Sequence, residues 1–280
     1  MKVGQASGFQ IAFLMYAVML LAVPLSSLAV RWTSLEGAAK TAIDKGAHFA
    51  LACLVIAAFP ALRRTVLQAM SRPIPGEMRS EVAAVAILKI VLGLGSIAGL
   101  ALWFWLTDGP ARVDRMTVNV EREWANAFSA DGLVRLALAA TIGPIVEEIV
   151  FRGLMYPAFE RQWGWVGGMV MTSILFGLYH PHFWHAFAAS VLLVCLMRRT
   201  GSLRAPIVVH MFYNLMLWWP LLGQYVFPDG AVLGELATWR FHGACLAVAA
   251  IALPTYVWMS RERRAEAPAA HRESDAPLPQ

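Results

Sequence analysis

The sequence predicts an all-α polytopic membrane protein with about eight transmembrane helices, and three observations support this prediction. Of the 280 residues, 59% are hydrophobic and only 15% are charged, whereas an average soluble domain is about 25% charged. The mean hydropathy of the chain is +0.58. The hydrophobic residues also gather into long runs, and a helix needs ~20 such residues to cross a bilayer. A soluble fold could not bury this much apolar surface, and a disordered chain would not contain it.

Eight apolar segments qualify as membrane-spanning helices. They lie near residues 9–30, 47–62, 82–106, 133–157, 165–181, 184–197, 205–222 and 239–259. The first segment lacks a clear small-residue cleavage site, so it is interpreted as a span and not as a signal peptide. The fifth and sixth segments are the least regular, because Pro181 and His182 interrupt the apolar sequence between them.

The basic residues predict the orientation of these spans. With the N-terminus in the cytoplasm, thirteen of the 23 Lys and Arg residues face the cytoplasm, eight face the other side and two lie within spans. The clusters Arg63–Arg64, Arg198–Arg199 and Arg261–Arg264 all fall on the cytoplasmic side. The positive-inside rule therefore places both termini in the cytoplasm. The basic residues lie at the ends of apolar runs and form no stripe, which excludes nucleic acid as a partner. The Ala- and Arg-rich composition favours a bacterial inner membrane.

The fourth span is unusual because it carries three charged residues, Glu147, Glu148 and Arg152. An ionisable group inside a membrane costs about 2.5–3.5 kcal/mol on insertion scales, so each one is a functional hypothesis. Glu148 and Arg152 are four residues apart and share one helical face, where they can form an ion pair. Glu147 points about 100° away and has no partner in its own helix. Such a carboxylate is suited to act as a general base; for the Glu148–Arg152 pair, a purely structural ion pair between helices is the alternative.

Two later spans supply polar partners for Glu147. The fifth span ends with Phe176 and His180, four residues apart, and the seventh opens with His210 and Asn214 at the same spacing. Polar groups on separate membrane helices need one another, because lipid offers no hydrogen bonds. We therefore expect these side chains to meet.

The remaining ionisable groups near the spans are predicted to be peripheral. Lys89 lies near an end of the third span, from which its ammonium can reach the interface. His48 is assigned to the interface as well. His182 and His185 are interpreted in the same way, with a place lining the site as the alternative.

Elimination leaves water activation as the chemistry of this polar set. The chain has no Gly-x-Ser-x-Gly and no His-Glu-x-x-His, and no Asp lies in a span. Glu147 could take a proton from a water that His180 also holds, while His210 and Asn214 donate hydrogen bonds to the oxyanion. The alternative is a divalent metal such as zinc, with Glu147, His180 and His210 as ligands and one open position. No cofactor is favoured.

These motifs resemble those of the CPBP family of membrane proteins. The resemblance rests on Glu147-Glu148-x-x-x-Arg152, Phe176-x-x-x-His180 and His210-x-x-x-Asn214, in that order on successive spans, and covers about residues 133–220. The family groups type II CAAX prenyl endopeptidases with bacteriocin-processing and immunity-related proteins. The resemblance implies a conical intramembrane catalytic cavity, a water-activating pair of Glu147 and His180, and an oxyanion hole made by His210 and Asn214. Glu148, Arg152 and Phe176 would support them.

The resemblance predicts an intramembrane endopeptidase that cuts a membrane-associated or lipid-modified peptide, either CAAX-like or a signal or sorting peptide. The lipid bilayer and this peptide are then its partners. The alternative is a transporter or binding protein without enzymatic activity, whose buried Glu and His residues carry protons or a metal.

Four regions are predicted along the chain. Residues 1–130 form a three-span region with an amphipathic helix at the outer interface, residues 131–225 the CPBP-like core, residues 226–259 the last span and residues 260–280 a disordered cytoplasmic tail. The amphipathic helix is placed at 110–132, where apolar residues recur every three or four positions. A surface loop is the alternative there.

The depths of the polar residues do not agree if the spans are straight. At 1.5 Å per residue, His180 lies roughly 24 Å from the start of the fifth span, whereas His210 lies only about 10 Å from the start of the seventh. Both must still reach Glu147. Either the fifth span starts deep, or the chain at 181–186 re-enters.

Overall fold

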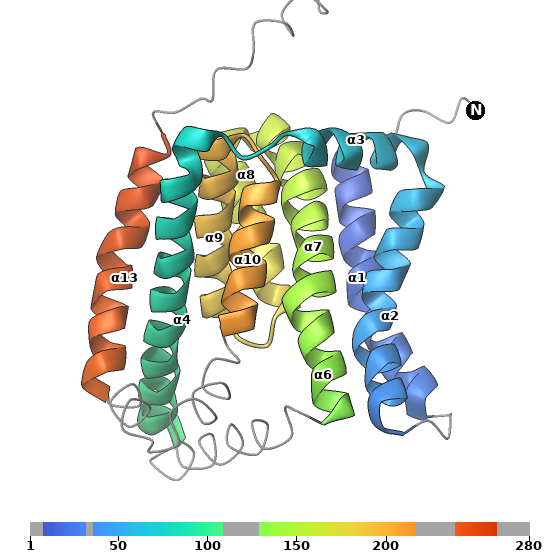
Figure 1. Cartoon of the computed structure of the whole chain (residues 1–280), viewed down its shortest axis with the longest axis horizontal. Helices are drawn as coiled ribbons and strands as arrows, with labels where there is room; N and C mark the ends of the chain where they lie inside the picture. Colours follow the sequence, from blue (N-terminus) through green and yellow to red (C-terminus); the bar gives the residue numbers. More distant parts are fainter. Residues whose placement is uncertain (1–7, 32–35, 109–128, 217–238, 262–280) are drawn as a thin grey trace, which may run out of the picture.

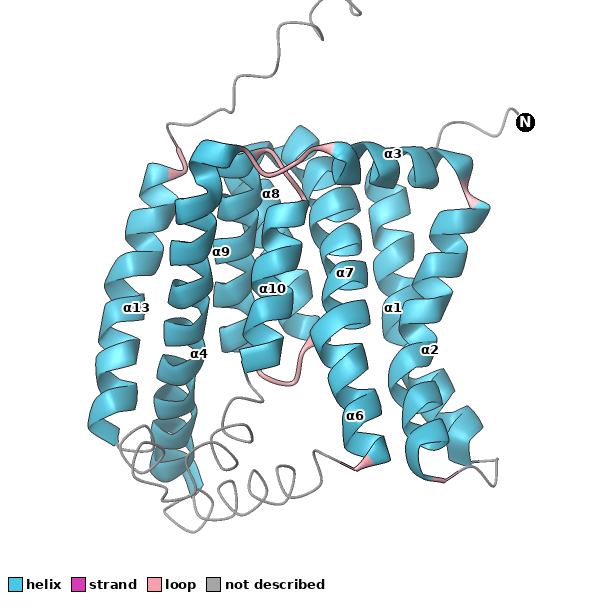
Figure 2. Cartoon of the chain, viewed as in Figure 1, coloured by secondary structure: helices cyan, strands magenta, loops and turns pink. Residues whose placement is uncertain are grey.

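The computed structural model describes residues 8–31, 36–108, 129–216 and 239–261, and the regular elements in these ranges are all helices (Figures 1 and 2). The first group is α1 (Gly8–Arg31), α2 (Gly37–Ala58), α3 (Pro60–Ser71), the short η1 (Gly76–Met78) and α4 (Arg79–Asp108). The second is α6 (Ala130–Ala137), η2 (Leu138–Ile142), α7 (Gly143–Glu148), η3 (Ile149–Met155), α8 (Tyr156–Tyr179), α9 (Phe183–Thr200), α10 (Arg204–Met216) and α13 (Trp239–Met259). The predicted amphipathic helix at 110–132 and the tail at 260–280 fall almost entirely outside the described residues.

The long helices run side by side, and α3 lies across their ends (Figure 1). Helices α1 and α2 form one packed pair at one side of the molecule, and α4 and α13 form another at the opposite side. The segment from α6 to α10 lies between these pairs. The helices that carry the predicted polar motifs therefore lie between one pair of helices that comes from the N-terminal part of the chain and another that includes the C-terminal helix α13.

Each of the eight predicted apolar segments overlaps a helix, but the number of spans stays a prediction. Among the described residues, one helix is long and apolar enough to cross a membrane, Arg240–Met259. A second qualifies if the pair Gly37–Ile43 and Gly46–Ala58, bent by 41°, counts as one span. Helix α10 has only 13 residues, which is about 20 Å at 1.5 Å per residue and less than a hydrocarbon core of about 30 Å.

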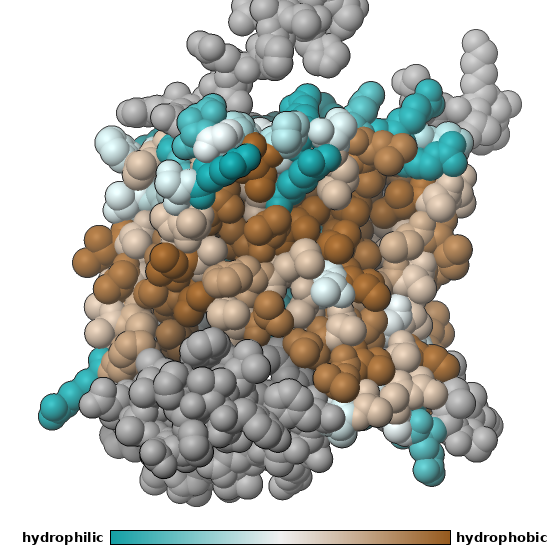
Figure 3. Space-filling model, viewed as in Figure 1, coloured by the Kyte–Doolittle hydropathy of each residue, from teal (hydrophilic) through white to brown (hydrophobic). Residues whose placement is uncertain are grey.

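The surface of the molecule has an apolar belt. Figure 3 shows brown side chains across the middle of one face, with hydrophilic residues gathered along the edge where α3 lies. Large apolar side chains that face outward include Leu54, Ile87 and Ile251. An exposed apolar surface of this extent is typical of contact with lipid.

Two arginines at the end of α9 join three helices at the edge where α3 lies. Arg199 forms a bidentate ion pair with Glu81 of α4 and donates a hydrogen bond to the carbonyl of Met259, 2.9 Å away at the end of α13. Arg198 donates to Glu160 of α8 at 2.9 Å and to the Ser260 carbonyl at 3.2 Å. These contacts hold α13 against the segment that carries the polar motifs.

Gly164 explains why the fourth and fifth predicted spans are separate segments. Its backbone angles are φ 71° and ψ 175°, and they interrupt the helix within α8. An L-residue with a side chain rarely adopts this conformation, whereas glycine adopts it readily. The chain therefore turns at Gly164, between the predicted segments 133–157 and 165–181.

The position of the turn at 180–182 removes the disagreement in depth. The part of α8 after Gly164 has 15 residues to Tyr179, about 22 Å at 1.5 Å per residue. Figure 2 shows the turn that follows it lying well short of the ends of α4 and α6. The chain thus reverses inside the bundle, and His180 Nε2 lies 3.8 Å from Glu147 Oε2 beside this turn.

Candidate active site

The backbone that carries the two glutamates is widened on both sides. Helix α7 is preceded by the π-helical turn η2 and followed by the π-helical turn η3. A Cβ atom at Gly143 would lie 2.8 Å from the Leu138 carbonyl and 3.0 Å from the Phe49 ring, so this junction has room only for glycine. Pro144 is tolerated because it occupies the first turn of α7. Helical turns of this kind often lie at functional sites.

Glu148 is fully buried and holds two partners with one oxygen. Its Oε1 accepts a hydrogen bond from Arg152 Nη1 at 3.1 Å and another from His210 Nδ1 at 2.7 Å. The four-residue spacing predicted the first contact. The second fixes the imidazole of α10 against the end of α7 and directs its Nε2 away from Glu148.

Glu147 lies between two imidazoles. Its Oε2 is 3.8 Å from His180 Nε2 and 3.9 Å from His210 Nε2. Both distances are too long for direct hydrogen bonds, and separations beyond 3.5 Å are ones that a water can bridge. The structure thus brings Glu147, His180 and His210 together, as the order of the motifs predicted.

Both imidazoles present a lone pair to Glu147 when they are neutral. His180 lies at the end of α8, where its Nδ1 is 2.8 Å from the Phe176 carbonyl. A carbonyl only accepts hydrogen bonds, so Nδ1 carries the proton and Nε2 the lone pair. The same argument applies to His210, because the Glu148 carboxylate accepts from its Nδ1.

Phe176 supports the charged groups through its ring. The ring is buried, with the Arg152 guanidinium 4.3 Å from its centroid and the His180 ring 4.3 Å away. Phe151 packs edge-on at 4.9 Å. The ring therefore fixes the position of the arginine and of the histidine through one set of contacts.

Asn214 makes a backbone contact that its predicted role did not include. It follows His210 by one turn of α10, and its Nδ2 donates to the Ala139 carbonyl in η2 at 2.7 Å. That carbonyl lies within a π-helical turn. The contact joins α10 to the widened helix, and the role of Asn214 as an oxyanion donor stays a prediction.

Sequence reasoning was wrong about Lys89 and His48. Lys89 is 2% exposed and its Nζ lies 4.0 Å from the centre of the Tyr213 ring, so the ammonium does not reach an interface. Because α4 begins at Arg79, Lys89 lies about 15 Å along the helix. His48 is buried as well, with its ring 3.8 Å from that of Phe49. The apolar residues on both sides of Lys89 in the sequence were the signal that could have predicted its burial.

The turn after α8 contributes a further histidine. His185 lies in the first turn of α9, and its Nε2 is 3.1 Å from the Tyr213 hydroxyl. His182 is exposed. Of the two histidines assigned to the interface, His185 therefore faces the interior of the bundle.

The predicted metal ligands lie somewhat farther apart than a tetrahedral zinc site needs, and the metal alternative stays a prediction. Bonds of about 2.0–2.1 Å in a tetrahedral site would bring the donor atoms closer than the 3.8 Å and 3.9 Å found here. No three His, Cys, Asp or Glu side chains in the described part of the chain are arranged to hold a metal ion. The chemistry below is therefore derived from the side chains alone.

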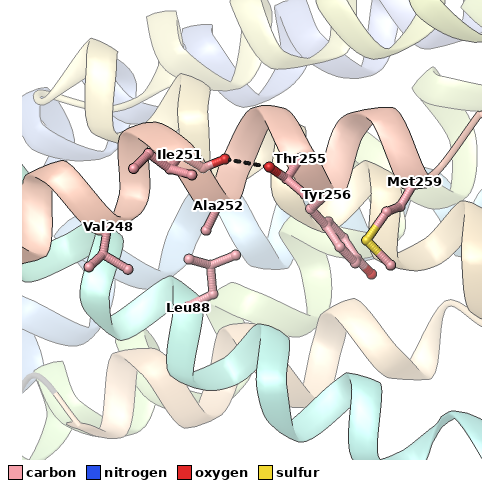
Figure 4. Close-up of a pocket in the computed structure, with 7 residues that line it drawn as sticks. All are labelled: Leu88, Val248, Ile251, Ala252, Thr255, Tyr256 and Met259. Atoms are coloured by element: carbon pink, nitrogen blue, oxygen red, sulfur yellow. Dashed lines mark hydrogen bonds between the residues drawn. The ribbon is translucent and has the colours of Figure 1, made fainter.

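An apolar groove lies elsewhere, between α4 and α13 (Figure 4). Its volume is about 430 Å³, and it is lined by Leu88, Val248, Ile251, Ala252, Thr255, Tyr256 and Met259. None of these is a predicted site residue. The groove is thus separate from the conical catalytic cavity, which stays a prediction.

Comparison with known families assigns this segment. Residues 129–216 match the family model described as type II CAAX prenyl endopeptidase Rce1-like. This match covers less than half of the chain. It begins one residue before α6 and ends with α10, so the matched segment includes Glu147, His180 and His210. The resemblance stated from the motifs is confirmed, while the predicted boundaries at 131 and 225 stay a prediction.

A curated relative gives a second comparison. The Bacillus subtilis (strain 168) protein named "Putative membrane peptidase YdiL" is 27% identical over 129 residues, which are 43% of this chain and 53% of the relative. The chain thus spans about half the length of this relative. No solved structure gives a significant match. Both printed names describe peptidases.

Proposed function

We propose that the chain is an intramembrane endopeptidase that hydrolyses a peptide bond of a membrane-associated substrate with a water activated by glutamate and histidine. One observation carries the proposal: Glu147 faces the Nε2 atoms of two histidines at 3.8 Å and 3.9 Å. A water placed there can donate to the carboxylate and to an imidazole lone pair at once. Both acceptors then raise the nucleophilicity of the water oxygen.

The first step forms a bond between the water oxygen and the carbonyl carbon of the substrate. Glu147 accepts the proton that the water loses, and His180 orients the water from the other side. The tetrahedral intermediate then breaks its carbon–nitrogen bond. The proton held by Glu147 passes to the leaving amine, so the carboxylate is regenerated.

His210 has to donate a hydrogen bond if it stabilises the oxyanion. With Nδ1 bound to Glu148, its Nε2 donates only when the imidazole carries both protons. Asn214 has a second N–H besides the one that binds Ala139, and that N–H is the donor we assign to the oxyanion hole.

The surroundings favour a substrate that is itself embedded in or attached to a membrane. The site lies among the central helices behind an apolar belt (Figure 3). A lipid-modified peptide of the CAAX type, or a signal or sorting peptide, partitions into lipid and can approach between helices. We place the protein in a bacterial inner membrane with both termini in the cytoplasm.

The test compares the purified wild type with Glu147→Gln in detergent, with co-resident membrane peptides as substrates and mass spectrometry as the readout. The wild type should release fragments that the variant does not. Ile87→Met, on the outward face of α4, controls for handling and should match the wild type. Identical fragments from the wild type and Glu147→Gln would refute the proposal.

A further inference from the structure

Lys89 is a buried cation without a carboxylate in direct contact. It is 2% exposed, and among the residues that the structure describes no carboxylate lies within 4.0 Å of its Nζ. Its described contact is the face of the Tyr213 ring at 4.0 Å. A ring face attracts an ammonium but accepts none of its N–H groups as a carboxylate would. The donors of Lys89 therefore remain available to a ligand.

The packing around Tyr213 gives this lysine a defined setting. A Cβ atom at Gly93, one turn after Lys89, would lie 2.4 Å from the Tyr213 hydroxyl, so glycine makes room for the ring against α4. The hydroxyl in turn meets His185 Nε2 at 3.1 Å. Helices α4, α9 and α10 thus meet around one tyrosine.

His185 adds a second unused polar atom. Its Nδ1 is buried and has no hydrogen-bond partner in the described part of the chain. When the Tyr213 hydroxyl donates to Nε2, the neutral ring carries its proton on Nδ1. Lys89 and His185 then both offer hydrogen-bond donors, which suits an anion that accepts several bonds.

This group of side chains lies beside the reacting residues. Tyr213 is three residues after His210 on α10, and His185 is five residues after His180. Lys89 is close enough to Glu148 and to Glu147 to interact with both electrostatically. A ligand that reaches Lys89 therefore also extends toward the bond-cleaving groups.

We propose that Lys89 binds a carboxylate of the peptide substrate, with His185 as a second donor. The proposal deepens the proposed function and rests on it. Glu148 Oε1 already binds Arg152 and His210, Glu148 Oε2 has no hydrogen bond to Lys89 or to another described residue, and the desolvated ammonium gains from an anion that arrives with the substrate. The carboxylate is either the C-terminus of the peptide or an acidic side chain.

The experiment uses a short S-farnesylated peptide in three forms: free acid, C-terminal amide, and free acid with its single internal Asp changed to Asn. Cleavage gives kcat and KM, and equilibrium binding to detergent-solubilised protein gives Kd. For the wild type, loss of the recognised carboxylate should raise KM and Kd by about 30-fold or more. The form that loses affinity identifies the C-terminus or the side chain as the source.

Variants of Lys89 distinguish recognition of the substrate carboxylate from simple neutralisation of the charge of Glu147. Lys89→Met should bring the affinity of the favoured peptide down to that of its uncharged form, and Lys89→Arg should keep part of the preference. Ile87→Met, exposed on the same helix, should keep all of it. A Lys89→Met protein that cleaves every form more slowly by the same factor would refute recognition, because a cation that only balances Glu147 would act in this way.

The failures of the two proposals can be told apart. Wild type that cleaves or binds the three forms equally overturns the role of Lys89 even if no Lys89 variant folds. Wild type that cleaves none of them counts against the endopeptidase, while the Kd values still decide whether Lys89 selects a carboxylate.

Discussion

Glu147 and Glu148 are adjacent in the chain, but their side chains have different surroundings. One oxygen of Glu148 binds Arg152 and His210 in a position without solvent exposure. Glu147 meets no donor at hydrogen-bond distance in the described residues and faces two imidazole Nε2 atoms. Removing the charge of each residue should therefore affect a different property of the protein.

Glu148→Gln should destabilise the protein. The substitution leaves Arg152 charged and without its carboxylate in a buried site, and breaking a buried pair costs roughly 3–5 kcal/mol. Glu147→Gln should keep its Tm and lose cleavage, because it removes the base and breaks no ion pair of this kind. Thermal unfolding in detergent and cleavage rates measure both effects. A stable Glu148→Gln protein together with an unfolded Glu147→Gln protein would reverse the roles.

Asn214→Ala should slow turnover by about 10²–10³ with little change in KM, as expected for a lost oxyanion donor. The same substitution removes the contact with Ala139, so Tm has to be measured as well. Leu215→Ala changes the exposed neighbour on α10 and serves as the control. Normal turnover in Asn214→Ala would remove this residue from the site.

Cleavage should survive exhaustive chelation. The Glu147 carboxylate and the His180 lone pair are sufficient for proton abstraction from a water, and the separations of 3.8 Å and 3.9 Å are wider than a tetrahedral zinc site needs. Activity is measured after dialysis against a chelator, and again after adding zinc. An activity that disappears with the chelator and returns with the metal would instead assign the reaction to metal-assisted hydrolysis.

At the scale of the elements, Gly164 decides where the chain turns. Its φ of 71° with ψ of 175° is a region that residues other than glycine rarely adopt, and a Cβ atom there would meet nothing within 4 Å. Gly164→Ala should therefore destabilise the protein by about 1–3 kcal/mol through the backbone alone. Gly76→Ala is the matched control, since it also has open space and has no positive φ. Equal Tm values for the two variants would contradict this explanation.

The sequence predicted some contacts between elements and missed others for a physical reason. Helical spacing was enough to pair Glu148 with Arg152, and the order of the motifs was enough to bring His180 and His210 to Glu147. Burial of Lys89 depends on which helices pack against α4, which periodicity along one helix does not contain. The π-helical turns beside α7 were missed because their hydrogen-bond register leaves no clear mark in the residue types.

At the scale of the whole molecule, the segment that connects α3 to α4 and the segment that connects α9 to α10 lie on the same side of the helix bundle. The Ser202 hydroxyl donates to the Arg72 carbonyl at 2.7 Å, and Arg204 Nε donates to the Met70 carbonyl at 2.7 Å. The chain between α3 and α4 therefore touches the chain between α9 and α10. Both must face the same side of a membrane, as the basic residues predicted independently.

Reporter fusions after residue 75 and after residue 202 should both report the cytoplasm, and a fusion after residue 229 should report the outside. The first two positions belong to these two joined segments, and the basic residues nearby favour the cytoplasm. Position 229 lies outside the described residues and tests the eight-span topology. A cytoplasmic signal there would contradict that topology.

The turn at 180–182 also has a consequence for the water supply of the proposed reaction. Side-chain exposure falls along the site, from 27% at His180 to 10% at Glu147 and 0% at Glu148. The adjoining His182 is exposed. The exposed end of the site thus lies at the turn, and the proposed hydrolysis would draw its water from that end while the Glu148–Arg152 ion pair stays buried.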